Sequence, residues 1–331
     1  MKRYLKSLFY LLLLFLFLFT GFYFWASSPN LSREEYAIIE SSDPAAAPSN
    51  DSVFSVLTYN IGYLSGMTNN LPVEKPRSLY EKNLLKVLAE LKAVNADILA
   101  FQEIDYHSKR SYFINQQSEI AELAYPFAGK CINWDKRYVP FPYYPFSMHF
   151  GQMLSGQSVL SKYPILEQER IELVRNVSQP FYSDRFYLDR LAQVVRLRLG
   201  KQMLVLINVH LEAFDKDTRL QQTRRVRELY LKYYKEFPTI LLGDFNSDPE
   251  ELDPSIQLIL DLPKTGNAAF GNAGKEKTYS SREPTKRLDY IFYNTEFIQE
   301  LGGTMERSGK QEQNKQVLNV YLSHHDQLNE Y

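Results

Sequence analysis

Short apolar runs alternate with polar residues throughout the chain after residue 53. Such runs, rich in Val, Ile and Leu and bounded by polar or turn residues, are typical of buried strands. A single polar residue after a strand usually marks a turn, but four such strand ends together predict a shared site. The four predicted strands and the residues that follow them are 53–59 before Asn60, 96–101 before Gln102 and Glu103, 203–209 before His210, and 239–243 before Asp244 and Asn246.

Segments with apolar residues at helical spacing lie between these strands. Residues 79–94 carry Leu84, Leu88 and Leu91, and residues 219–234 precede the fourth strand. Strands that alternate with helices predict a layered α/β fold. Ligands of such folds bind at the carboxyl ends of the strands, which is where the polar side chains lie.

Two more strands are predicted near the C-terminus, over 287–293 and 317–322. The first carries Asp289 near its start, so an antiparallel strand entered from the site side would bring this carboxylate to the other polar residues. The second is followed by His324 and His325, two of the five histidines in the chain. The sequence therefore predicts one site assembled from distant segments.

The N-terminus has the pattern of a membrane segment. Lys2, Arg3 and Lys6 precede an uncharged apolar run over residues 8–26. A helix of this length spans about 28 Å at ~1.5 Å per residue, close to the hydrocarbon thickness of a bilayer. Basic residues before the run favour a cytoplasmic N-terminus and export of the remainder. We predict a signal anchor over residues 1–26.

A cleaved signal peptide is the alternative, because Ala26, Ser27 and Ser28 are small residues suited to a cleavage site. The protein would then be secreted, and in both cases its body lies outside the cytoplasm. Residues 27–52 are rich in Ser, Pro, Ala and acidic residues, which predicts a flexible linker. One domain is predicted over residues 53–331.

Composition narrows the classes of function. The 331 residues include 38 Lys and Arg against 39 Asp and Glu, for a net charge of −1. This balance lacks the basic excess typical of proteins that bind long nucleic acids tightly, although a local basic groove is compatible with it. Cys131 is the single cysteine, which excludes an internal disulfide and a zinc cluster built from cysteines.

The ordered set of strand-end segments resembles the endonuclease/exonuclease/phosphatase superfamily, which includes DNase I-like nucleases, neutral sphingomyelinases and inositol phosphate phosphatases. The resemblance covers residues 53–326 and implies a four-layer αββα sandwich, in which two packed β-sheets are flanked by helices. The segments that carry it are TYNIGY around Asn60, FQEID at Glu103, GQSVLSKYPI from Gly156, NVHLE at His210, GDFNSDP at Asp244, RLDYIF at Asp289 and the terminal SHH.

The same resemblance implies roles for individual residues. Glu103 is similar to the principal Mg²⁺ ligand of the family, with Asn60 beside it as a metal or phosphate contact. Asp244 and Asn246 match the residues that orient the attacking water and hold the phosphoryl group. His210 matches a histidine that binds phosphate.

His325 matches the histidine of the hydrolytic step, with Asp289 as its hydrogen-bonded partner. The family usually has Asp directly before this histidine, and here His324 stands in that position. His324 can bind phosphate, or supply nitrogen to a softer ion such as Mn²⁺. A different alignment, with Asp326 in part replacing the missing acid, also remains open.

The chemistry of phosphoester hydrolysis explains these residue types. A phosphodiester is anionic, so its site needs a cation and donors that neutralise charge on the phosphoryl oxygens. Mg²⁺ prefers oxygen ligands and keeps several waters, so one or two carboxylates suffice. An imidazole can exchange protons near neutral pH. We hypothesise in-line attack by water, activated through Asp244 and the pair of His325 and Asp289.

Two segments are candidate specificity elements. Residues 138–150 are crowded with aromatic residues and prolines, and such a loop can enter lipid, stack on a ring or pack over the core. Residues 183–190 offer Arg185 and Arg190, whose guanidinium groups match phosphate geometry. Surface ion pairing is the alternative for both arginines.

Three functions remain open. The first is a phosphodiesterase that acts outside the cytoplasm on a lipid headgroup or another small phosphodiester, which the membrane segment and the balanced charge favour. The second is a membrane-anchored or exported nuclease. The third is a non-catalytic phosphate-binding module of the same fold. The sequence implies no protein partner.

Overall fold

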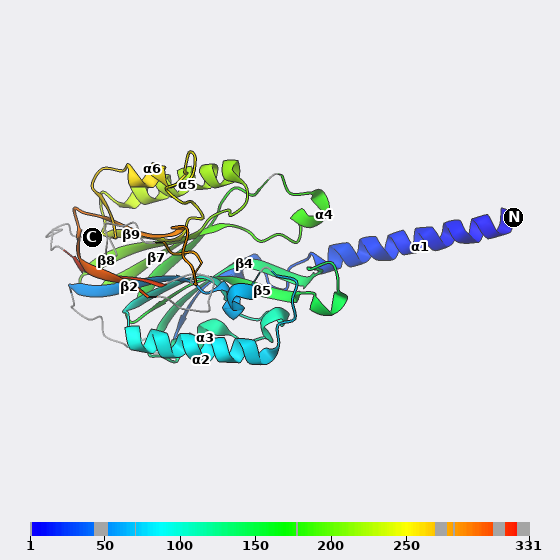
Figure 1. The fold of residues 1–331 in the computed structure, drawn as a ribbon, viewed down its shortest axis with the longest axis horizontal. Helices are drawn as coiled ribbons and strands as arrows, with labels where there is room; N and C mark the ends of the chain where they lie inside the picture. The colour runs from blue at the N-terminus through cyan, green and yellow to red at the C-terminus, as the bar shows by residue number, and fades with distance from the viewer. Residues whose placement is uncertain are drawn as a thin grey trace.

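Two β-sheets pack against each other, and helices cover their outer faces (Figure 1). The structure is a computed structural model that describes residues 2–42, 52–69, 71–176, 178–268, 277–280, 282–306 and 315–322. Within these ranges one sheet has seven strands and the other has six. The architecture is the DNase I-like four-layer sandwich that the sequence predicts.

The seven-stranded sheet is mixed, with β2 and β3 as its parallel pair. Its strands, in spatial order, are β1 (Ala37–Ser41), β4 (Phe127–Val139), β5 (Gly151–Ser161), β3 (Ile98–Asp105), β2 (Val53–Asn60), β13 (Lys315–Leu322) and β12 (Ile298–Glu306).

The six-stranded sheet contains a second parallel pair, formed by β8 and β9. Its spatial order is β10 (Thr265–Asn267), β11 (Asp289–Asn294), β9 (Thr239–Asp244), β8 (Gln202–His210), β7 (Leu191–Leu199) and β6 (Ile165–Glu172).

Helices on the outer faces complete the layers. The longer ones are α2 (Arg77–Val94) on the seven-stranded sheet and α5 (Lys216–Tyr233) on the six-stranded sheet, and both match the helices that the sequence predicts. The remaining helices are α1 (Lys2–Ala26), α3 (Gln116–Ala121), α4 (Phe181–Asp184), α6 (Gln257–Leu260), and the short 3-10 helices Arg33–Tyr36, Gly62–Leu64, Gly66–Thr68, Lys109–Ser111 and Phe146–Met148.

Strand periodicity explains why the layers hold together. Adjacent residues of one strand point to opposite faces: Val56 packs between the two sheets, whereas Leu57 packs under α2. On β9, Leu242 faces the core between the sheets and Leu241 faces α5. Because both faces are covered, these strands are apolar along their length rather than alternating.

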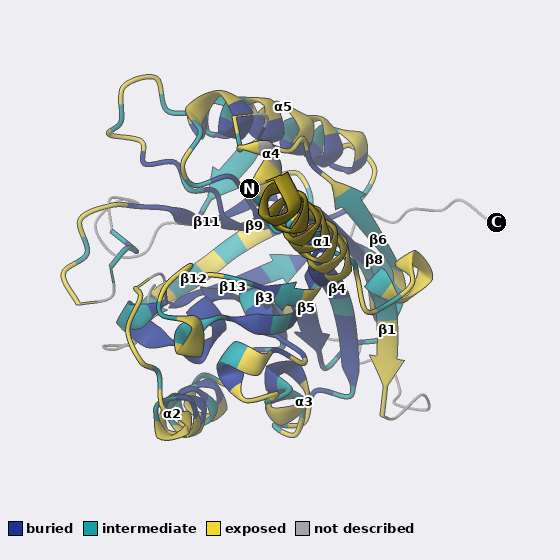
Figure 2. Ribbon diagram, turned by 90° about the vertical axis from the view of Figure 1, so that its right-hand side faces the viewer, coloured by how far each residue is buried: buried dark blue, intermediate teal, exposed yellow. Residues whose placement is uncertain are grey.

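The helix α1 projects away from the body, and Ala26 is the one buried residue of the helix (Figures 1 and 2). It is long and apolar enough to cross a membrane, with a mean hydropathy of 2.2. A helix that is apolar on all sides and leaves nearly all of that surface outside the protein is suited to lipid. The structure thus contains a candidate membrane span where the sequence predicts one.

The prediction of a flexible linker over residues 27–52 is wrong for its first part. Backbone N–H groups of Asn30 and Leu31 donate to the carboxylate of Asp135 at 2.9–3.0 Å. Strand β1 then pairs with β4 at the edge of the seven-stranded sheet. The polar composition concealed an edge strand, which needs only one neighbour and little apolar surface. Residues 43–51 lie outside the described part of the chain.

Candidate active site

The centre of the site lies at the end of the six-stranded sheet where strands β8 and β9 finish. We call this end of the two sheets the catalytic edge. His210 and Asp244 end the parallel strands β8 and β9 and are register partners. Asp289 begins β11, which runs antiparallel to β9, and lies opposite Asp244. The strands approach closely here because Gly243 has φ +131, and a Cβ at this position would stand 2.1 Å from the carbonyl oxygen of Val209.

Glu103 comes from the other sheet. It lies in β3 at an irregularity in the pairing with β5, between Phe101 and Ile104, and has φ +53. A bulge adds a residue to one strand and redirects its side chain, and a non-glycine residue in the left-handed region is typical of functional sites. Asn246 has a similar backbone conformation, with φ +51.

Asn60 joins the two sheets. Its Nδ2 donates to Glu103 Oε1 at 3.3 Å and to Asp244 Oδ2 at 2.9 Å. The backbone N–H of Gly62 donates to Asn60 Oδ1 at 3.0 Å, which fixes the orientation of the amide. The NH₂ group therefore faces the carboxylates, so Asn60 acts as a donor that holds Glu103 and Asp244 together.

His210 completes this cluster. Its Nε2 lies 3.6 Å from Glu103 Oε1 and 3.8 Å from Asp244 Oδ2. Four residues of the predicted site, which are far apart in the sequence, are thus within a few ångströms of one another. We call Asn60, Glu103, His210 and Asp244 the central cluster.

Asn246 lies directly beside the central cluster. Its backbone N–H donates to Asp244 Oδ1 at 2.9 Å, and its Nδ2 donates to the carbonyl oxygen of Leu211 at 2.9 Å. The loop after β9 is therefore fixed against the end of β8, and Asp244 has one carboxylate oxygen held by each neighbouring asparagine.

Three supporting residues were not predicted. Asn69 Nδ2 donates to Glu103 Oε2 at 2.7 Å. Below the cluster, Gln102 Nε2 donates to Asn208 Oδ1 at 2.6 Å, which links the two sheets through buried amides. Asn208 interrupts an apolar strand, and that polar residue was a usable signal. Asn69 lies in an irregular segment that offers no such signal.

Burial changes the proton affinities of the site. Desolvation raises the pKa of Glu103 above its usual value. Desolvation and the neighbouring Asp244 raise the pKa of Asp289 well above its usual range. Burial and the nearby positive charge of Arg190 lower the pKa of His210 well below its usual value, so that the ring is neutral at pH 7. Three carboxylates thus share one region, and two of them, Asp244 and Asp289, are buried.

The positive charge of Arg190 acts on both Glu103 and His210. It is buried, and its Nε lies 3.6 Å from Glu212 Oε2. The hydroxyl of Tyr187 donates to the same carboxylate at 3.2 Å. Within the described part of the chain, Arg190 Nε and Nη1 have no hydrogen-bond partner. Arg185, in contrast, is exposed and lies 5.0 Å above the ring of Phe24 in α1.

The donor set fits a hard divalent cation. Glu103 and Asp244 present carboxylate oxygens, and both oxygens of Asp289 are buried without a hydrogen-bond partner among the described residues. A cation would offset the burial and the mutual repulsion that raise the pKa values of Glu103 and Asp289. No three His, Cys, Asp or Glu side chains in the described ranges form a ready-made metal cage. Mg²⁺ does not need one, because it retains several waters.

Strand β13 runs in a direction that the sequence did not reveal. Gln316 lies opposite Thr58 and Tyr321 opposite Val53. Strand β13 therefore begins at the catalytic edge and ends near the start of β2, at the opposite end of the sheet. His324 and His325 lie outside the described residues. Their predicted roles stay predictions.

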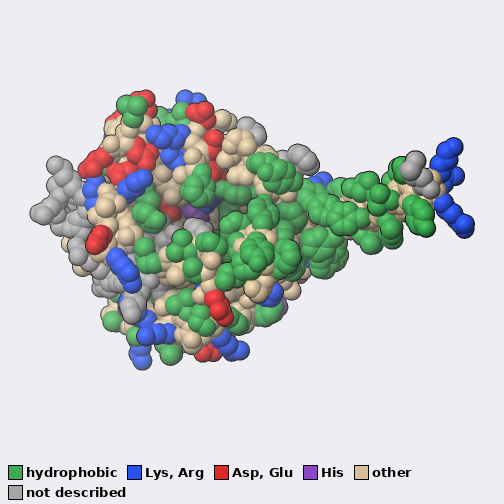
Figure 3. All heavy atoms as spheres, turned by 45° about the vertical axis from the view of Figure 1, so that its right-hand side comes forward, with side chains coloured by type: hydrophobic (Ala, Val, Ile, Leu, Met, Phe, Trp, Pro, Cys, Tyr) green, Lys and Arg blue, Asp and Glu red, His purple; other side chains and the backbone are tan. Residues whose placement is uncertain are grey.

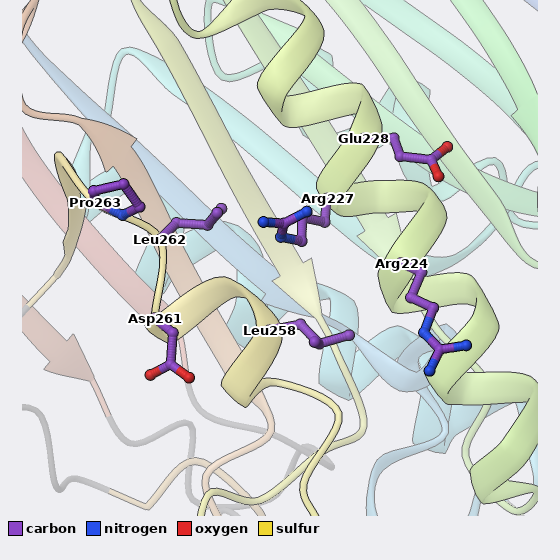
Figure 4. A pocket seen from close by; sticks show the side chains of 7 residues that line it. All are labelled: Arg224, Arg227, Glu228, Leu258, Asp261, Leu262 and Pro263. Atoms are coloured by element: carbon purple, nitrogen blue, oxygen red, sulfur yellow. The ribbon is translucent and has the colours of Figure 1, made fainter.

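Two surface hollows lie outside the central cluster. One, between α5 and α6, is lined by Arg224, Arg227 and Leu258 among others, and none of the predicted site residues reaches it (Figure 4). The other, of about 470 Å³, lies between α2 and the loop that joins β4 to β5. Its lining includes Arg110, whose guanidinium pairs with Asp105. None of the central-cluster residues lines this hollow.

Comparison with known proteins agrees with this architecture. A two-sheet sandwich with carboxylate, histidine and asparagine side chains collected at strand ends defines a DNase I-like protein. The model of the Endonuclease/Exonuclease/phosphatase family matches residues 57–308, and the chain belongs to this family. Members of the family are phosphoester hydrolases, which supports a reaction of that kind. No curated protein sequence matches the chain.

Solved structures show the same fold at low sequence identity. An endonuclease/exonuclease/phosphatase from Beutenbergia cavernae DSM 12333 has a TM-score of 0.57 and 17% identity, over 82% of this chain and 72% of the other. One from Bacteroides vulgatus has a TM-score of 0.58 and 16% identity, over 82% and 100%. The catalytic domain of human Nocturnin, with a bound sulfate anion, has a TM-score of 0.56 and 15% identity, over 87% and 98%.

Proposed function

We propose that this protein is a divalent-metal-dependent phosphoester hydrolase and that its substrate is a phosphodiester. The observation that carries the proposal is the central cluster, in which Asn60 bridges Glu103 and Asp244 across the two sheets with His210 beside them. A purely structural role would not require buried carboxylates to face each other, since their burial is unfavourable without a cation.

In this proposal Glu103 and Asp244 hold the metal, which is Mg²⁺ or Mn²⁺. When bound, the ion neutralises charge on the phosphoryl oxygens and lowers the pKa of coordinated water. Asn60 and Asn69 donate to Glu103 and fix the direction of its carboxylate. Hydrogen bonds of this kind, donated to a metal ligand by its neighbours, orient the ligand and tune its basicity.

The protein groups around the phosphorus atom of the substrate bind its oxygens and accept the proton of the attacking water. Arg190, whose Nε and Nη1 have no hydrogen-bond partner among the described residues, binds a phosphoryl oxygen. Neutral His210 donates a hydrogen bond to the substrate without adding charge. Asp289 lies opposite Asp244, and burial together with repulsion from Asp244 raises the pKa of Asp289. This pair accepts the proton of the attacking water, and no covalent intermediate is needed.

We further propose that α1 anchors the protein with the catalytic domain outside the cytoplasm. The basic residues at the start of α1 and its exposed apolar surface support this orientation. The last turn of the helix also packs on the body, where Phe22 contacts Tyr138 and Tyr23 contacts Phe186. Cleavage after α1 would give a secreted enzyme with the same site.

The test is hydrolysis by the full-length protein in lipid nanodiscs. Substrates are bis(p-nitrophenyl) phosphate, p-nitrophenyl phosphate, a phospholipid, sphingomyelin, and plasmid DNA, each with Mg²⁺, Mn²⁺ or EDTA. We expect metal-dependent cleavage of a diester, and Glu103→Ala should lower kcat/KM about a hundredfold or more. The matched control is Glu228→Ala, because Glu228 is exposed on α5 and pairs with Arg225.

Different outcomes separate the alternatives. Efficient cleavage of plasmid DNA that Glu103→Ala abolishes would instead assign a nuclease. Absence of hydrolysis for every substrate and ion would reject the enzyme and leave a phosphate-binding module.

A further inference from the structure

The loop between β4 and β5 exposes an unusual number of aromatic side chains. We call residues 140–149 the aromatic loop. The exposed fractions are 42% for Phe141, 60% for Tyr143, 80% for Tyr144 and 72% for Phe146. Clustered apolar surface of this kind marks a site of interaction rather than the ordinary surface of a soluble domain.

The aromatic loop lies beside the point where α1 leaves the body. The ring of Phe22 in α1 is 5.8 Å from the ring of Tyr138, at the end of β4. The hydroxyl of Tyr138 hydrogen-bonds His149 Nδ1 at 2.7 Å, at the other end of the loop. Figure 3 shows hydrophobic side chains gathered on the body around the base of the helix. The loop and the helix therefore form one apolar region.

The strand registers place this region at the catalytic end of the molecule. Gly156 of β5 lies opposite both Ile104, next to Glu103, and Ile132 of β4. From that level the β4–β5 hairpin continues to Gly151, opposite Val139. These five residues of strand extend about 17 Å beyond the level of Glu103. The aromatic loop, the base of α1 and the catalytic edge thus point the same way.

The residue types match the interface of a bilayer. Tyr and Trp concentrate where the hydrocarbon meets the headgroups. Trp25, in the last turn of α1, is 49% exposed. Exposed Arg185 lies over Phe24 in α1, and Arg137 is exposed on β4. Long cationic side chains beside a membrane helix can reach lipid phosphates.

We propose that the aromatic loop inserts into the headgroup region of the bilayer that α1 enters, which turns the catalytic edge toward the membrane surface. The position of the loop rests on the proposed function only in the role of α1 as a retained anchor, whereas the substrate class rests also on the proposed hydrolysis of a phosphodiester. The substrate class that follows is a phosphodiester carried by a lipid headgroup. A protein partner on the same surface is the competing occupant.

The position of the loop is tested in full-length protein in phosphatidylcholine nanodiscs, without any assay of activity. A fluorescent NBD label is attached to Tyr144→Cys, with Leu85→Cys as the control, because Leu85 is 68% exposed on α2. The native Cys131 is buried and should not label. We expect lipid-borne spin labels to quench fluorescence at position 144, and aqueous iodide to quench it at position 85. Quenching by iodide at both positions, or protection from both quenchers at 144, would overturn the proposal.

The consequence for the substrate is tested separately. The double variant Tyr144→Ser with Phe146→Ser should lower hydrolysis of a phosphodiester lipid in the bilayer about tenfold, while hydrolysis of soluble bis(p-nitrophenyl) phosphate changes less than about twofold. Equal losses on both substrates would contradict docking as the role of the loop. If the unmodified protein hydrolyses neither substrate, the proposed function fails, and the quenching result still decides whether the loop enters the membrane.

Discussion

Asp244 and Asp289 lie directly opposite each other on the antiparallel strands β9 and β11, and both are buried. Carboxylates in this arrangement repel, which is unfavourable for folding unless a cation or a proton is bound. The site is therefore arranged for chemistry at the expense of stability, and this conflict can be measured.

The first prediction concerns Asp289→Asn. Folding raises the pKa of Asp289, so this group opposes folding at any pH above its unfolded-state pKa, and the penalty disappears as the pH falls below that value. The amide should raise the unfolding free energy of the metal-free protein at pH 7 by about 1–2 kcal/mol. Hydrolysis should fall at the same time. Denaturant unfolding in EDTA measures the first effect, and a destabilised variant would refute the proposed electrostatic conflict.

The second prediction concerns metal-linked stability. A ligand that binds only the folded state at a hundred times its Kd adds about 2.7 kcal/mol to the unfolding free energy. Mg²⁺ or Mn²⁺ should therefore raise the Tm of the unmodified protein, and Glu103→Ala should remove most of that increase. Glu228→Ala should retain it. If Glu103→Ala responds to the ions as strongly as the unmodified protein, Glu103 is not a metal ligand.

The third prediction compares two arginines. Arg190→Lys keeps the charge but loses the forked donors, so kcat/KM should fall about tenfold to a hundredfold. Arg185→Lys should change kcat/KM by less than about twofold, because Arg185 lies on the ring of Phe24. Steady-state kinetics on a soluble diester measure both. Equal effects would show that the burial of Arg190 beside Glu212 does not reflect a role in substrate binding.

The fourth prediction concerns His210 and pH. Its pKa is lowered in the folded state, so the unfolded chain binds this proton first as the pH falls below about 6.5. The stability that His210 contributes is present above that pH and is lost on acidification. In EDTA, His210→Asn should lose less stability than the unmodified protein between pH 7 and the lowered pKa. Glu103 and Asp289 have raised pKa values and act with the opposite sign.

The experiment compares how steeply the unfolding free energies of the two proteins change with pH. Unfolding free energies are measured at half-unit pH steps for both proteins, and the other titrating groups cancel in the comparison. Parallel pH dependences would show that His210 is protonated to the same extent in the folded and unfolded states.

Some errors of sequence reasoning have a clear physical origin. The final strand was recognised by its apolar residues, but alternation of side chains is the same in both directions along a strand. Only pairing with β2 shows that β13 leaves the catalytic edge. The edge strand β1 was missed because its residues Ala37–Ser41 are partly exposed and their composition resembles a linker.

The sequence alone determined the strands and their polar ends, because burial on both faces demands continuous apolar runs and makes each interruption visible. It also determined the apolar N-terminal helix, since length and the absence of charge suffice for that. Tertiary structure alone decided which polar ends meet, that Asn60 joins two carboxylates from different sheets, and that α1 and the aromatic loop share the catalytic end. Those relationships depend on strand direction and register, which pairing between distant segments sets and no local pattern encodes.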